Sequence, residues 1–193
     1  MGAIALVVIS SIGAALVAGI TLLAAGADAP GALLAARNTA RFSSAVFLLA
    51  LLASSADRSR LPWLAERRVA LAWSFVAAHL VHYGAVVFQV FVNPQARRHL
   101  LAPPGSVVAT LGFSLVLVIG FTAAARTRAG TVWNRIATWT AAVLFVLALG
   151  SGASRGHRID VALGAAMALA AGASVWLLLR RRASAAASPG VAP

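Results

Sequence analysis

The sequence predicts an all-α integral membrane protein, a bundle of six transmembrane helices. Of the 193 residues, 61% are apolar and only 10% are charged, whereas about 25% of residues are charged in soluble domains. The mean hydropathy is +0.91. Apolar runs recur along the whole chain, and each can cross about 30 Å of hydrocarbon. Because backbone groups in lipid must bond within their own segment, these runs are expected to be helices.

Six apolar runs are separated by short segments rich in Pro, Gly and Arg, where helices end and turns are favoured. The expected spans are 3–26, 39–55, 69–92, 107–125, 132–150 and 161–179. One gap contains Asp28-Ala29-Pro30-Gly31, which we interpret as a turn between the first two helices. The runs form one membrane domain, 1–182. The remaining Ala- and Ser-rich residues, 183–193, have little to bury and are expected to be a disordered cytoplasmic tail.

The first run has a second interpretation, as a signal peptide, because small residues follow it at Ala25-Gly26-Ala27. It lacks a basic segment before the apolar core, and that core is longer than a signal peptide needs. A retained first helix is therefore the preferred interpretation.

The charge of the chain favours lipid over nucleic acid as a partner. The net charge is +12, but the arginines stand in short clusters between apolar runs, where lipid phosphates are the nearest anions. No nucleic-acid partner is expected. The chain has no Cys, which excludes disulfides, iron–sulfur clusters and covalently attached c-type haem.

The distribution of arginine predicts the orientation. With a cytoplasmic N-terminus, ten arginines lie on the inner side and six on the outer side. Positive residues accumulate on the cytoplasmic side of membrane proteins. Both termini are therefore expected in the cytoplasm.

The four acidic residues all fall in gaps or at expected helix ends: Asp28, Asp57, Glu66 and Asp160. We therefore expect no buried carboxylate, which argues against an ion-coupled transporter. Asp160 stands near the start of the last run, where a negative charge favours the positive end of the helix dipole.

Two histidines, His79 and His82, lie well inside the third run. Residues three apart share one helix face, and 11 residues from Arg68 at about 1.5 Å each place His79 near the membrane midplane. An imidazole in hydrocarbon needs a partner. That partner is either a metal or haem iron, or a pair of interhelical hydrogen bonds. His99 and His157 stand in gaps and are interpreted as solvated surface residues.

A dispersed set of residues around this third run forms a recognisable pattern: Arg37, Arg41-Phe42, Leu61-Pro62, Arg67-Arg68, Phe75, His79-Leu80, Tyr83 and Trp133. In these residues the sequence resembles the ferric-reductase-like transmembrane domain family, and within it the haem-binding membrane subunits of periplasmic methionine sulfoxide reductase systems, the MsrQ type. The resemblance covers about residues 35 to 150.

The resemblance implies a six-helix domain that holds b-type haem between facing helices and carries electrons across a bacterial inner membrane. His79 would be the haem-iron ligand, and a redox or membrane-protein partner would be needed. Because His82 lies on the same helix face as His79, we expect it to be a further cofactor-binding residue. No catalytic residue is expected, because the chain has no nucleophile–base pair and no nucleotide-binding glycine motif. The chain is thus at most the electron-transfer subunit of an oxidoreductase.

The sequence departs from the family in the fifth run. No histidine occurs between His99 and His157, so ligation of iron by two histidines on the third and fifth helices is not available. Three hypotheses stay open. The chain binds haem through His79 or His82 with an unusual second ligand, it is a haem-free structural or assembly partner, or it is a small transporter.

Overall fold

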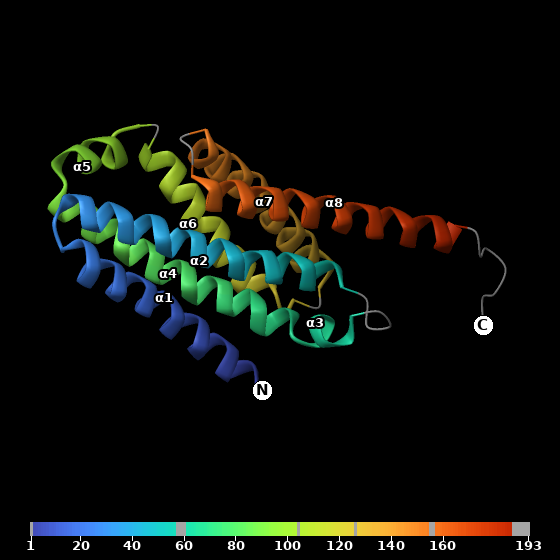
Figure 1. Ribbon diagram of the computed structural model, residues 1–193. Coiled ribbons are helices and arrows are strands. Elements are labelled where there is room, and N and C mark those ends of the chain that lie inside the picture. Colours follow the sequence, from blue (N-terminus) through green and yellow to red (C-terminus); the bar gives the residue numbers. More distant parts are fainter. Residues whose placement is uncertain (1, 57–60, 104, 126, 155–156, 187–193) are drawn as a thin grey trace.

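The computed structural model describes residues 2–56, 61–103, 105–125, 127–154 and 157–186, and the regular elements in these ranges are all α-helices. Long helices lie side by side, with two short helices in their connections (Figure 1). The helices are α1 Ala3–Ala25, α2 Ala29–Ser55, α3 Pro62–Glu66, α4 Arg68–Val92, α5 Pro94–Leu101, α6 Gly105–Thr122, α7 Arg128–Ala153 and α8 Arg158–Ala186. The predicted all-α fold is confirmed.

Within the described ranges, five helices are long and apolar enough to cross a membrane: α1, α4, α6, α7 and α8. Much of their apolar surface is exposed in the isolated chain, as at Ile4 and Leu23 of α1, which are 81% and 89% exposed. Soluble proteins rarely expose such a surface, and a lipid bilayer would cover it. The predicted span 39–55 is not among the five, because the helix containing it, α2, also carries polar residues such as Arg37 and Asn38.

Helix α2 begins about ten residues earlier than expected. Asp28 does not form a turn between helices but caps α2, since its side chain accepts a hydrogen bond from the backbone N–H of Gly31 at 3.1 Å. Pro30 follows in the first turn, where its missing N–H costs nothing. The preceding helix ends at Gly26, which has a φ of 90°. The break between α1 and α2 is therefore only a few residues long.

The core of the bundle forms around α2, which packs against α1, α4 and α8. Phe47 and Leu51 of α2 and Phe75 of α4 are fully buried or nearly so. The ring of Phe47 lies 4.8 Å from that of Phe75 and 5.0 Å from that of Phe145 on α7, measured between centroids. These three rings, the phenylalanine cluster, join the central helices near the middle of the bundle.

The short helices mark the two ends of the bundle, called here the α3 end and the α5 end (Figure 1). Asn93 begins α5, and its side chain accepts hydrogen bonds from the N–H groups of Gln95 and Ala96. At the other end of the chain, α8 continues to Ala186, so helix extends into the segment interpreted as a tail. Residues 187–193 of that tail lie outside the described ranges.

Candidate functional site

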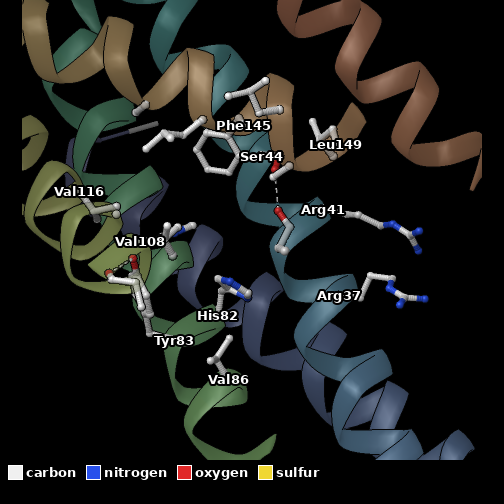
Figure 2. A pocket seen from close by; sticks show the side chains of 18 of the residues that line it. Arg37, Arg41, Ser44, His82, Tyr83, Val86, Val108, Val116, Phe145 and Leu149 are labelled. Carbon is white, nitrogen blue, oxygen red and sulfur yellow. Dashed lines mark hydrogen bonds between the residues drawn. The ribbon is translucent and has the colours of Figure 1, made fainter. Parts of the chain in front are cut away.

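A cavity of about 690 Å³ opens between α2, α4, α6 and α7 near the α5 end. Leu100 of α5 and Gly105 of α6 also line it. Figure 2 shows Arg37, Arg41 and Ser44 reaching it from α2, His82 and Tyr83 from α4, and Phe145 from α7. Its size lies within the range of roughly 300–1,000 Å³ typical of small-molecule and cofactor sites.

His79 lines this cavity and is 8% exposed. Its Nδ1 atom lies 2.9 Å from the hydroxyl oxygen of Ser43 on α2. The same hydroxyl lies 3.0 Å from the carbonyl oxygen of Ala40. A carbonyl cannot donate and the hydroxyl has one proton, so both contacts are hydrogen bonds together only when the hydroxyl donates to Ala40 and accepts from an N–H at Nδ1. In that tautomer the lone pair of the ring lies on Nε2.

His82 lines the same cavity and is held in the same way. Its Nδ1 atom lies 3.2 Å from the hydroxyl oxygen of Thr39. That hydroxyl lies 2.8 Å and 3.0 Å from the carbonyl oxygens of Ala35 and Ala36, so it too donates to the backbone and accepts from the imidazole. The centroids of the His79 and His82 rings are 5.0 Å apart.

The two interhelical hydrogen bonds satisfy one nitrogen of each ring. Interhelical hydrogen bonds were one of the two interpretations of this histidine pair, and a metal or haem partner was the other. The second nitrogen of His79 remains, and the described residues offer it no hydrogen bond. The nitrogens of an imidazole point in divergent directions, and Nδ1 faces α2. Nε2, with its lone pair, is therefore the atom that His79 presents to the cavity.

Aromatic rings surround His79. The ring of Tyr83 lies 4.9 Å away in an edge-to-face arrangement, and that of Phe145 lies 5.6 Å away. The Tyr83 hydroxyl donates to the carbonyl of Ala109 on α6 at 3.5 Å. Together these contacts join α4 to α6 and α7 around the imidazole.

The rim of the cavity is polar. Arg41 donates to both carboxylate oxygens of Asp160, at 2.6 Å and 3.1 Å. Nη1 of Arg37 lies 3.3 Å from Nε2 of His157. The Arg41–Asp160 pair connects α2 to the start of α8, and the Arg37–His157 pair connects α2 to the residue just before α8.

One sequence-based expectation is wrong at this rim. Asp160 was expected to be an unburied helix-end residue, but it is only 5% exposed, because the first turn of α8 packs against α2 and Arg41 neutralises its charge. His157, interpreted as a solvated residue, is half-buried and lines the cavity beside Arg37. His99 is exposed on α5, as expected, and does not line the cavity.

A second, smaller cavity of about 240 Å³ lies toward the α3 end. Arg68 of α4 and Arg135 of α7 line it, and so does Phe47. Phe47 packs against Phe75 and Phe145, which line the first cavity. The phenylalanine cluster therefore stands between the two cavities.

The hydroxyl partners of the histidines were not identified from the sequence. A signal was present, since Thr39 and Ser43 are four residues apart and so lie on one face of α2. Within the described residues, no group of three or more His, Asp or Glu side chains could hold a metal ion.

The chain matches no family model, no curated protein and no solved structure.

Proposed function

We propose that this chain is a membrane subunit that binds one b-type haem in the cavity beside His79 and serves in transmembrane electron transfer. The observation that carries the proposal is the His79 imidazole. One of its nitrogens is fixed by Ser43 on α2, and the other is left for a large apolar cavity. A fixed N–H and a free lone pair are the arrangement of a metal-binding histidine.

The residues present fit a haem with one axial histidine. The cavity volume of about 690 Å³ suits a cofactor of that class. Its α6 and α7 walls carry apolar side chains such as Val116 and Leu144. Haem also has two carboxylates, and Arg37 with His157 at the polar rim would bind them. Arg41 is already neutralised by Asp160 and is less suited to that role.

When bound, haem supplies the uptake and release of single electrons. The residues of the chain would do the rest. Ser43 orients the His79 ring, and the α6 and α7 side chains exclude water and lower the local polarity. No nucleotide-binding glycine motif occurs in the sequence, so the electrons would come from and go to partner proteins.

We further infer that α2 is a sixth span and that both termini are cytoplasmic, as suits a subunit of a bacterial inner membrane. At 27 residues, α2 is about 40 Å long, which exceeds the hydrocarbon thickness. It packs beside α1 and α4, both candidate spans. Its polar side chains Arg41 and Thr39 are engaged inside the bundle by Asp160 and His82, so they do not face lipid.

One observation favours the haem-free alternative, a structural or assembly partner. The α7 wall of the cavity contributes no histidine, so haem would lose the second ligand that the family resemblance implies. The transporter hypothesis is weaker, because the phenylalanine cluster interrupts the polar lining between the two cavities.

The test is an absorption spectrum of the protein purified after expression with ample haem. We expect a Soret band with about one haem per chain, which His79→Ala abolishes and His99→Ala, on the exposed side of α5, leaves unchanged. A haem-free wild-type protein would favour the structural alternative. Loss of haem in His82→Ala, with retention in His79→Ala, would show that His82 is the ligand and that the assignment to His79 is wrong.

A further inference from the structure

We propose that haem held by His79 keeps its sixth coordination position open, so that this chain binds a small diatomic molecule, such as carbon monoxide or nitric oxide, at the iron. The inference rests on the proposed function and extends it. The observation that carries it is the distribution of possible ligand atoms around the cavity, which cluster on one side.

Among the described residues, the α6 and α7 walls of the cavity contain no side-chain ligand for iron. Helix α7 lines the cavity with Ala141, Leu144, Phe145 and Ala148, which share one helix face, and with the neighbouring residues Leu147 and Leu149. Helix α6 contributes residues such as Val108, Gly112 and Val116. None of these side chains carries a nitrogen, oxygen or sulfur atom that could coordinate a metal.

Two other side chains near His79 line the cavity and carry atoms that could coordinate iron. They are His82 and Tyr83, and both are on the same helix as His79. Axial ligands approach iron from opposite faces of the porphyrin. The His82 ring lies only 5.0 Å from that of His79 and is held by the same neighbouring helix, α2. His82 therefore approaches from the same side as His79. Tyr83 donates its hydroxyl to Ala109.

The remaining donors belong to the rim and have partners. His157 is bonded through Nε2 to Arg37, and both oxygens of Asp160 are bonded to Arg41. Recruiting either residue as an iron ligand would break a contact between α2 and α8. A single imidazole is thus the ligand set that the native packing supplies.

Iron with one histidine ligand binds gases, as in globins, and the polarity of the opposite pocket selects among them. In the part of the chain that the structure describes, the α6 and α7 walls of this cavity are apolar and carry no side-chain hydrogen-bond donor. Bound dioxygen needs a donor to stabilise the negative charge that develops on it, whereas carbon monoxide and nitric oxide depend on one much less. The chemistry therefore favours the latter two.

The experiment uses the full-length haem-loaded protein in detergent. We expect a high-spin spectrum of the ferric form and a shifted Soret band when carbon monoxide is added to the dithionite-reduced form. A low-spin ferric spectrum without a carbon monoxide shift would overturn the open position while leaving haem binding, and the proposed function, intact. A protein without haem would overturn both.

Variants of α7 test the geometry independently. Leu144→His and Ala148→His place an imidazole on the cavity-lining face, and we expect at least one of them to give a low-spin spectrum and to lose carbon monoxide binding. Val143→His is the matched control, because Val143 is on the same helix, is 57% exposed and does not line the cavity. If neither cavity variant changes the spectrum, the assignment of α7 to the opposite wall is wrong.

Discussion

Ser43 is the side chain on which the properties of His79 depend most directly. Its hydroxyl forms a hydrogen bond with Nδ1 of His79 at 2.9 Å, which fixes the orientation of the ring. We expect Ser43→Ala to weaken haem binding by roughly 10- to 100-fold, the usual cost of losing a partner of a metal-binding histidine. Titration of the haem-free protein with haem measures this affinity.

Ser44→Ala is the matched control for that prediction. Ser44 is adjacent in sequence and lines the same cavity, but its hydroxyl donates to the carbonyl of Ala40 at 2.7 Å and not to a histidine. Its replacement should leave haem affinity near that of the wild type. Equal losses in both variants would indicate a general disturbance of α2 and not a specific role for Ser43.

At the scale of single residues, the sequence predicted the burial of the histidine pair but not its partners. His79 and His82 were identified because imidazoles are unusual inside an apolar run. Their bonds to Ser43 and Thr39 depend on the register between α2 and α4, which sequence does not specify. The burial of Asp160 was missed for the same reason, since its partner Arg41 is 119 positions away.

At the scale of elements, the Arg41–Asp160 ion pair joins α2 to α8. Both side chains are largely buried, 16% and 7% exposed, so removing one leaves the other as an unpaired charge. We expect Arg41→Gln or Asp160→Asn to lower the free energy of unfolding by about 3–5 kcal/mol. Thermal unfolding in detergent, followed by circular dichroism, measures the effect.

The double variant distinguishes pairing from simple loss of polar groups. Arg41→Gln with Asp160→Asn carries no buried charge, so its destabilisation should be smaller than the sum of the two single effects. Arg97→Gln, at an exposed position of α5, is the control and should be close to neutral. Strict additivity of the two single effects would argue against coupling between the side chains.

The positions of α1, α4, α6 and α7 could be predicted to within about four residues, because apolar runs of that length have few alternatives in a membrane, whereas α8 continues to Ala186, past the expected end at 179. The start of α2 could not be predicted in this way. Its first ten residues include Arg37 and Asn38, which hydropathy assigns to a loop. Their polar groups are satisfied inside the bundle, by His157 and Thr21, so the helix continues where composition alone predicts an end.

At the scale of the whole molecule, the number of spans decides which segments share a side of the membrane. If α2 crosses, the N-terminus and α3 lie on one side and α5 on the other. If α2 does not cross, α5 lies on the same side as the N-terminus.

Because the chain has no Cys, one introduced thiol reports each position without background. We expect a membrane-impermeant maleimide applied outside intact cells to label Gln95→Cys on α5, and not Gly2→Cys or Glu66→Cys on α3. Labelling of Gly2→Cys and Glu66→Cys with protection of Gln95→Cys would keep six spans but reverse the orientation. Identical behaviour of Gly2→Cys and Gln95→Cys would mean that α2 stays on one side, and the polar contacts of Arg41 and Thr39 would then need an explanation outside the hydrocarbon core.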